Sequence, residues 1–295
     1  MNESVKVKKS QTVLAMILMM ICIMQIETII KGMKKALIIC ATSVIPSLFI
    51  FMVFSEIIVT LISENNKRKL PIKYIIFILG SLCGFPVGAT VCKKFYESGL
   101  INKYDAERLI PFCNNASPAF VIGAVGTTML NSKMLGLIVY LAEVLASLFP
   151  VIMLKISENK SVINNKYSSL SETFFAAVEK STHNIFKICS LICIFTSVLA
   201  MLENTPFLFF ATLLELSCGC SYSASILQSN AIVSVVMIGF CCGFSGLCVH
   251  AQIQSIFKIS YKKMFICKLI QGILCSVICF LLLNYLLSCD KIILS

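Results

Sequence analysis

Long apolar runs separated by short polar segments make up most of the chain. A membrane-spanning helix needs about 20 mostly apolar residues, and runs of that kind lie at 12–30, 42–62, 111–130, 134–156, 185–202, 231–249 and 264–288. The pattern predicts an all-α polytopic membrane protein with about seven full spans.

Two further apolar segments, 72–92 and 206–230, are interrupted near the middle. The first contains Pro86, which removes a backbone donor and favours a bent tip with freed carbonyls. Its regularly spaced glycines are Gly80, Gly84 and Gly88. Because this spacing is equally typical of closely packed membrane helices, tight packing and a substrate-facing hairpin tip both stay open as interpretations.

Lysine and arginine concentrate in a few loops, which the positive-inside rule places in the cytoplasm. The loops assigned to the inside are 63–73, 93–110, 155–187 and 258–263, and those assigned to the outside are 130–133, 203–206 and 217–230. Segment 72–92 then enters and leaves on the inner side, and 206–230 on the outer side. Both are predicted to be re-entrant hairpins, which are tolerated where protein or a water-filled cavity covers their backbone. The lysines of 31–35 would lie outside, against the rule.

The two hairpins divide the chain into similar halves. We expect an N-terminal span (1–25), a first repeat (26–156, with the inner hairpin), a cytoplasmic linker (157–170) and a second repeat (171–295, with the outer hairpin). Each repeat is predicted to begin with an interfacial helix, at about 26–40 and 171–187. Since the hairpins enter from opposite sides, the repeats are inverted, which is the architecture of secondary transporters.

Composition excludes several classes of function. The chain is 58% apolar and 13% charged, whereas an average soluble domain is about 25% charged. The net charge of +11 is interpreted as basic cytoplasmic loops rather than nucleic-acid binding, because no basic stretch is interleaved with aromatic residues. The cysteines lie mostly in apolar runs without a CxxC pair, and no HExxH or similar catalytic motif is present. We therefore expect no enzyme, metal centre or cofactor, and a coupling Na⁺ or H⁺ stays open.

Polar residues inside apolar runs are the candidates for a binding site. Asn114, Asn115 and Ser117 lie between Pro111 and Pro118, where freed carbonyls, amides and a hydroxyl would suit a polar ligand or Na⁺. The alternative is a helix N-cap at the membrane surface, and the depth of the segment decides between the two.

Acidic residues inside apolar runs are scarce. A charge at the bilayer centre costs about 2.5–3.5 kcal/mol on insertion scales, so it is usually kept for a ligand, ion or proton. We rank Glu215 first, at the apex of the outer hairpin with Ser217 and Gly219, then Glu143, and then Glu56, which lies near a cytoplasmic end.

A last polar group ends the 231–249 run. Ser245 and Gly246 precede His250, whose side chain would titrate near neutral pH or donate to an anionic ligand. An interfacial histidine at the end of a span is the alternative.

Three of these strings resemble a known family. GFPVGA at 84–89, FCNNASPAFVIGAVG at 112–126 and GLCVHAQ at 246–252 are similar to the YlbJ-type sporulation integral membrane proteins, and the resemblance extends over about 36–290. It implies a nucleoside-recognition gate domain, similar in plan to concentrative nucleoside transporters, with two inverted repeats that each contain a re-entrant hairpin. It also implies a multi-pass protein of the outer forespore membrane that passes dipicolinate from mother cell to forespore.

The resemblance assigns the candidate residues to two half-sites. The first contains Gly84, Pro86, Gly88, Asn114, Asn115 and Ser117, and the second contains Glu215, Ser217, Gly219, Ser245, Gly246 and His250. The second hairpin reads SCGC where a Thr-rich or Ser-rich turn is expected. The implied partners are a small-molecule solute and membrane lipid, with no nucleic acid, and oligomerisation stays open.

Two hypotheses follow for the function. A carrier of a small anionic or nucleoside-like solute requires a polar, partly open pocket between the hairpin tips, lined by Asn114, Asn115 and Glu215. A membrane assembly or gating protein without transport would instead tolerate Asn115→Ala and Glu215→Gln.

Overall fold

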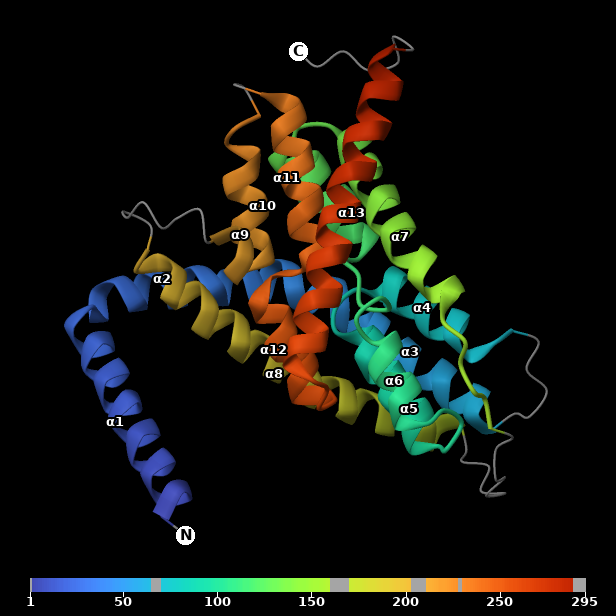
Figure 1. The fold of residues 1–295 in the computed structure, drawn as a ribbon, viewed down its shortest axis with the longest axis horizontal. Coiled ribbons are helices and arrows are strands. Elements are labelled where there is room, and N and C mark those ends of the chain that lie inside the picture. The colour runs from blue at the N-terminus through green and yellow to red at the C-terminus, as the bar shows by residue number, and fades with distance from the viewer. Residues whose placement is uncertain (1, 65–69, 160–169, 203–210, 228–229, 289–295) are drawn as a thin grey trace.

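The protein is described by a computed structural model that covers residues 2–64, 70–159, 170–202, 211–227 and 230–288 (Figure 1). Within these ranges the chain forms helices joined by short connections, and no strand is present. In chain order the elements are α1 (Asn2–Met24), α2 (Ile26–Ile39), η1 (Cys40–Val44), α3 (Ile45–Glu64), α4 (Ile72–Cys83), α5 (Val87–Glu97), α6 (Lys103–Leu109), η2 (Ala119–Met129), α7 (Lys133–Met153), α8 (Leu170–Ala200), α9 (Ala211–Leu214), α10 (Leu216–Ala224), α11 (Ala231–Phe244), α12 (Gly246–Ile256) and α13 (Tyr261–Ser288).

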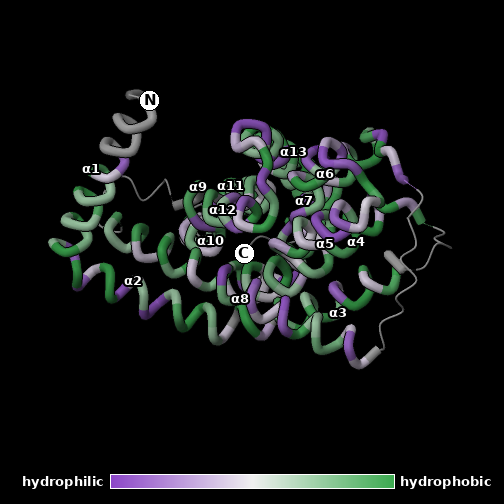
Figure 2. The backbone as a smooth tube through the Cα atoms, turned by 90° about the horizontal axis from the view of Figure 1, so that it is seen from below, coloured by the Kyte–Doolittle hydropathy of each residue, from purple (hydrophilic) through white to green (hydrophobic). Residues whose placement is uncertain are grey.

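Four segments of the described chain are long and apolar enough to cross a membrane. They are Lys133–Met153, Ser171–Ala200, Ala231–Ile256 and Tyr261–Ser288, and the bent α1–α2 pair would make a fifth. Apolar residues run along the helices in Figure 2, including the faces turned away from the body. The all-helical, membrane-spanning class is therefore confirmed, whereas the predicted seven spans are not.

Two predicted spans are shorter helices in the structure. The run at 111–130 becomes helical only at Ala119, so that η2 is a π-helix of 11 residues, shorter than the about 20 residues that a span needs. The two prolines that flank 112–117 prevent a regular helix there. The run at 42–62 is divided between η1 and α3, and its apolar helix extends over Leu48–Ile62.

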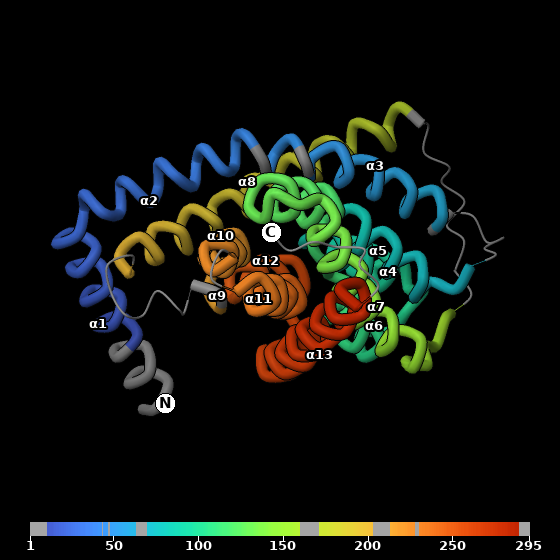
Figure 3. The backbone as a smooth tube through the Cα atoms, turned by 90° about the horizontal axis from the view of Figure 1, so that it is seen from above, coloured from blue at the N-terminus to red at the C-terminus, as the bar shows by residue number. Residues whose placement is uncertain are grey.

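The second repeat begins differently from the prediction, whereas the helix expected at about 26–40 is α2, Ile26–Ile39. The expected interfacial helix at 171–187 and the span at 185–202 form one continuous helix, α8, of 31 residues. The axes of the N-terminal helix and α2 meet at 88°, and α1 stands apart from the body in Figures 1 and 3. Helix α2 packs on α8 at Gly32, where a Cβ atom would lie 2.8 Å from the Cα of Ser197.

The turn between α4 and α5 holds the first helix break. Gly84 has a φ of 84°, a left-handed conformation that glycine adopts without strain. The backbone carbonyl of Cys113 fits between α4 and α5, the helices on either side of this turn. A Cβ atom would lie 1.8 Å from the Cys113 oxygen at Gly80 and 1.7 Å from it at Gly88. Gly80 and Gly88 thus allow close packing, and Gly84 allows the turn, so that both interpretations of the sequence apply to these glycines.

The second half contains two comparable breaks. Glu215, in extended conformation, separates α9 from α10, and Ser245, with a φ of 72°, separates α11 from α12. These breaks contact each other, since a Cβ atom at Gly246 would lie 3.2 Å from the amide nitrogen of Leu216. The predicted outer hairpin falls partly outside the described residues, at 206–210 and 228–229.

The order of elements is similar in both halves of the chain. A long helix (α3 or α8), two interrupted helical segments and a second long helix (α7 or α13) follow one another in each half. Whether the halves form inverted repeats with the boundaries 26–156 and 171–295 stays a prediction. Of the linker 157–170, residues 160–169 lie outside the described ranges, and Ile101 pairs with Glu158 beside it.

Replacing Gly88 by alanine tests the packing of the first break. The added Cβ would collide with the Cys113 carbonyl, and overpacking of this kind costs about 1–3 kcal/mol. We expect a lower melting midpoint, followed by circular dichroism in detergent. Gly123→Ala is the matched control, because nothing lies within 4 Å of its Cβ position. Equal midpoints for the two variants would contradict the described packing.

Candidate functional site

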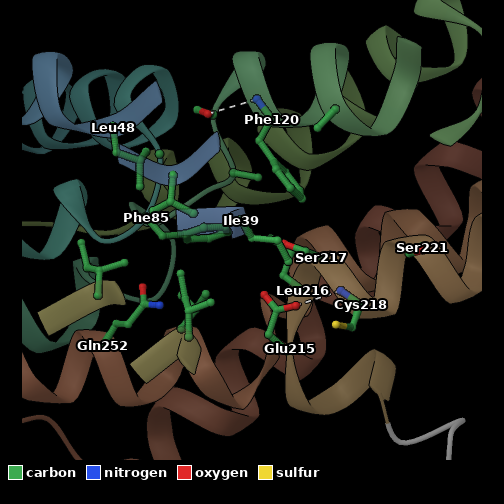
Figure 4. Close-up of a pocket in the computed structure, with 18 of the residues that line it drawn as sticks. Ile39, Leu48, Phe85, Phe120, Glu215, Leu216, Ser217, Cys218, Ser221 and Gln252 are labelled. Atoms are coloured by element: carbon green, nitrogen blue, oxygen red, sulfur yellow. Dashed lines mark hydrogen bonds between the residues drawn. The ribbon is translucent and has the colours of Figure 1, made fainter. Parts of the chain in front are cut away.

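A cavity of about 450 Å³ lies between the helix breaks of the two halves (Figure 4). This volume is within the range of about 300–1,000 Å³ that is typical of ligand sites. Residues at the breaks line the cavity from both halves of the chain. They are Gly84, Phe85, Ala116 and Ser117 from the first half and Glu215, Leu216, Ser217 and Cys218 from the second. The cavity is therefore built by segments far apart in the sequence.

The first-half wall is formed by the turn at Gly84 and the segment before η2. The Oγ atom of Ser117 accepts a hydrogen bond from the Phe120 amide at 3.3 Å, so its hydroxyl caps η2 while facing the cavity. Gly84 and Ser117 are neighbours, since a Cβ atom at Gly84 would lie 2.9 Å from the Ser117 Cβ. The rings of Phe85 and Phe120 provide apolar surface beside these groups.

The second-half wall is formed by the first turn of α10. Glu215 is 6% exposed, and its Oε2 atom accepts a hydrogen bond from the Cys218 amide at 2.8 Å. A carboxylate in this position also complements the positive end of the helix dipole. Ser217 on α10 and Gln252 on α12 add a hydroxyl and an amide to the lining of the cavity.

The remaining walls come from the long helices beside the breaks. Ile39 and Leu48 lie on the α2–α3 side, and Ile188 and Ile192 lie on α8. Lys35 of α2 brings a basic side chain to the cavity. An apolar cavity with a few convergent polar groups is the usual composition of a small-molecule site.

Asn114 and Asn115 lie behind this cavity, fully buried. Asn114 ties the non-helical segment to α5, because its Oδ1 atom accepts from the Ala89 amide at 3.0 Å. The Asn115 amide donates to the hydroxyls of Ser81 and Ser147, each at 2.9 Å. The two amides therefore hold the break in place instead of facing the cavity.

Helices α7 and α13 supply further partners of the same segment. The Oε1 atom of Glu143 accepts from the Ala116 amide at 2.7 Å, and Lys268 donates to the Asn114 carbonyl at 2.6 Å. The Gln271 amide donates to the Asn115 Oδ1 at 2.8 Å. Peptide groups that the break releases are thus paired with charged or amide side chains.

The break at Ser245 is held in a similar manner. The Nε2 atom of His250 lies 2.9 Å from the Phe244 carbonyl, and since a carbonyl can only accept, this nitrogen carries the proton. His250 is fully buried and its ring centroid lies 4.9 Å from that of Phe244. Its Nδ1 atom has no hydrogen-bond partner among the described residues.

The structure separates the predicted site residues into two groups. Gly84, Ser117, Glu215 and Ser217 line the cavity. The others lie in the packing of the breaks behind its lining: Pro86, Gly88, Asn114, Asn115, Gly219, Ser245, Gly246 and His250. The carrier hypothesis requires Asn114, Asn115 and Glu215 in the lining of the pocket. Of these three residues, only Glu215 lines the cavity.

The lower-ranked acids have other roles. Glu56 lies 2.9 Å from the Lys94 ammonium and 3.2 Å from that of Lys180, which connects α3, α5 and α8 by ion pairs. Within the described ranges, no group of three or more His, Cys, Asp or Glu residues is placed to hold a metal ion.

Sequence reasoning missed Lys268, Gln271, Ser81 and Ser147. Lys268 is a lysine inside the apolar run 264–288, and a charge at such a position is usually paired and functional. The isolated Lys268, with Gln271 one helical turn later, indicated a buried polar group in the sequence. It was missed because only acidic residues were ranked as buried charges.

Comparison with known proteins identifies a relative. The chain is 24% identical over 305 aligned positions to the sporulation integral membrane protein YlbJ of Bacillus subtilis (strain 168), which covers 81% of this chain and 74% of the relative. No protein-family model matches the chain. No solved structure matches it either. The similarity to YlbJ and the apolar helices together support an integral, multi-pass membrane protein.

Replacing Asn115 by alanine tests the role of the amide network. Ser81, Ser147 and Gln271 would each lose a partner, at about 1–3 kcal/mol for every buried polar group left unsatisfied. We expect a clear drop in the melting midpoint. The control is Asn284→Ala, because Asn284 is exposed and donates to Phe280 of its own helix. A midpoint like that of the control would show that the network contributes little.

Proposed function

We propose that this relative of the sporulation integral membrane protein YlbJ is a membrane carrier of a small polar solute. The observation that carries the proposal is the cavity lined by Gly84 and Ser117 from one half of the chain and by Glu215 and Ser217 from the other. In secondary transporters the substrate lies between discontinuous helices where two repeats meet. A cavity between helix breaks is the corresponding arrangement.

The proposal includes an inverted-repeat architecture. The similar order of elements in the two halves supports it, as does the contact between breaks within each half, Gly84 with Ser117 and Gly246 with Leu216. Segments 72–92 and 206–230 would be the re-entrant hairpins, entering from opposite sides, on the plan of the nucleoside-recognition gate domains. Solute access would then alternate by movement of one repeat against the other.

We further propose dipicolinate as the solute and the outer forespore membrane as the location, as the family resemblance implies. A flat aromatic dicarboxylate has an apolar face and two negative ends. The rings of Phe85 and Phe120 would suit its face, and Lys35 together with the N-terminus of α10 would suit a carboxylate. Helix N-termini that point at anionic groups occur at substrate sites of this architecture.

The acid in the cavity determines how such an anion can bind. An ionised Glu215 would repel a dicarboxylate across a cavity with largely apolar walls. We therefore propose that Glu215 binds a proton together with the solute, which makes the proton the coupling ion. The Gln variant keeps an oxygen for the Cys218 amide and removes the charge.

A nucleoside is the second candidate solute. Glu215, Ser217 and Gln252 are hydrogen-bonding groups in the lining of the cavity, and such groups suit ribose hydroxyls. For a nucleoside the ionised Glu215 would be an acceptor, so that Glu215→Gln would weaken binding. The two solutes therefore predict opposite effects of one substitution.

Uptake into proteoliposomes tests the proposal, with labelled dipicolinate and labelled uridine compared in parallel. We expect dipicolinate uptake that an inward proton gradient stimulates. Glu215→Gln is expected to keep dipicolinate binding and to lose this stimulation. The control is Glu27→Gln, because Glu27 is exposed on α2.

Each other outcome has a defined meaning. Uptake of uridine, weakened by Glu215→Gln, would favour the nucleoside carrier. Binding of neither solute to the folded protein would reject the carrier and favour an assembly or gating protein without transport.

A second substitution tests the location of the site. Ser217→Ala removes a hydroxyl that faces the cavity, and the loss of one hydrogen bond to a charged solute costs about 1.5–3 kcal/mol. We expect the Kd for dipicolinate, measured by calorimetry in detergent, to rise by about tenfold or more. Ser190→Ala, on the exposed side of α8, is the control. An unchanged Kd would place the solute elsewhere.

A further inference from the structure

Backbone carbonyls released by a helix break are the groups that coordinate a coupling Na⁺ in carriers with discontinuous helices. In this chain the Asn114 carbonyl is such a group, because Asn114 lies in the non-helical connection between α6 and η2. Its oxygen is already bound by the Lys268 ammonium at 2.6 Å. The lysine extends from α13, which belongs to the other half of the chain.

The surroundings of Lys268 are those of a small monovalent cation. The side chain is fully buried, and a second oxygen, the Oε1 atom of Gln271, lies at 3.1 Å. The ammonium is 5.8 Å from the centroid of the Phe85 ring, within the distance at which an aromatic face attracts a cation. Two oxygens and a ring face thus surround one positive charge.

An acidic side chain binds the same segment as Lys268. The Glu143 carboxylate binds the Ala116 amide at 2.7 Å, two residues after the carbonyl that Lys268 binds, and it interacts electrostatically with the lysine. One positive and one negative group therefore bind opposite ends of the same short segment. A Na⁺ ion at the Asn114 carbonyl would add a second buried cation beside the first, against strong repulsion.

The corresponding carbonyl of the second half is also bound. The protonated Nε2 of His250 donates to the Phe244 carbonyl at 2.9 Å, directly before the break at Ser245. In both halves a side-chain nitrogen thus takes a carbonyl at the break. His250 binds a carbonyl of its own half, six residues earlier, whereas Lys268 binds a carbonyl of the other half of the chain.

We propose that Lys268 is a tethered cation, which occupies the position of a coupling sodium ion and makes the protein independent of Na⁺. The tethered cation affects folding and ion binding whether or not the protein is a carrier. Uptake without a sodium gradient rests on the carrier function proposed above.

Melting of the purified protein in detergent tests the proposal without transport. NaCl is exchanged for N-methyl-D-glucamine chloride at constant ionic strength. We expect the same midpoint for the wild-type protein in both salts. Lys268→Ala, which vacates the position and leaves Glu143 unbalanced, is expected to have a lower midpoint without Na⁺ and a saturable rise as Na⁺ is added.

Two matched variants identify the cause of that rise. Lys268→Met fills the same space with an apolar chain, so that we expect a lower midpoint that does not respond to Na⁺. Lys262→Ala removes an exposed lysine from the first turn of α13 and is expected to behave as the wild type in both salts.

A saturable rise of the wild-type midpoint with Na⁺ would overturn the proposal, and this measurement needs no variant to fold. A Lys268→Ala protein that stays unfolded or unresponsive in Na⁺ would also count against it. In proteoliposomes we expect uptake to be unchanged when Na⁺ is replaced. Absence of all uptake would reject the carrier function, whereas the melting results would still decide the position of the cation.

Discussion

The structure depends on pairing the peptide groups that a helix break releases inside an apolar protein. Each such group costs several kcal/mol when it is left unpaired in a membrane. Between Cys113 and Ser117 the chain is not helical, and its polar groups are bound by Lys268 from α13 and Glu143 from α7. Two long helices, from different halves of the chain, therefore stabilise the break by bringing charged side chains to it.

This pairing also explains why the cavity and the polar network are adjacent but distinct. Asn114 and Asn115 are turned toward α5, α7 and α13, so that the next residues, Ala116 and Ser117, face the cavity. On the other side Glu215 both caps α10 and faces the cavity. A few adjacent residues thus supply both the groups that stabilise the breaks and the groups that are available to a solute.

Much of the fold was predictable because it follows from local chemistry. Apolar runs require membrane-spanning helices, and Gly84 with Pro86 requires a turn, since no regular helix accommodates both. The predicted division of α8 into an interfacial helix and a span was wrong, because Leu170–Ala200 is one continuous helix, whose backbone groups pair without a break. The number of spans depended on whether 111–130 was helical throughout, which hydropathy does not report.

The sequence by itself determined the class of protein and the turn at Gly84 and Pro86, because each of these depends on residue type within a short window, and it predicted Glu215 as a site residue. Only the tertiary structure decided which polar residues face the cavity. Asn115 and Ser117 are both polar and two residues apart, yet one is bound by Ser81, Ser147 and Gln271 and the other lines the cavity. The difference arises from partners more than thirty residues away in the chain, and it could not be read from the local sequence.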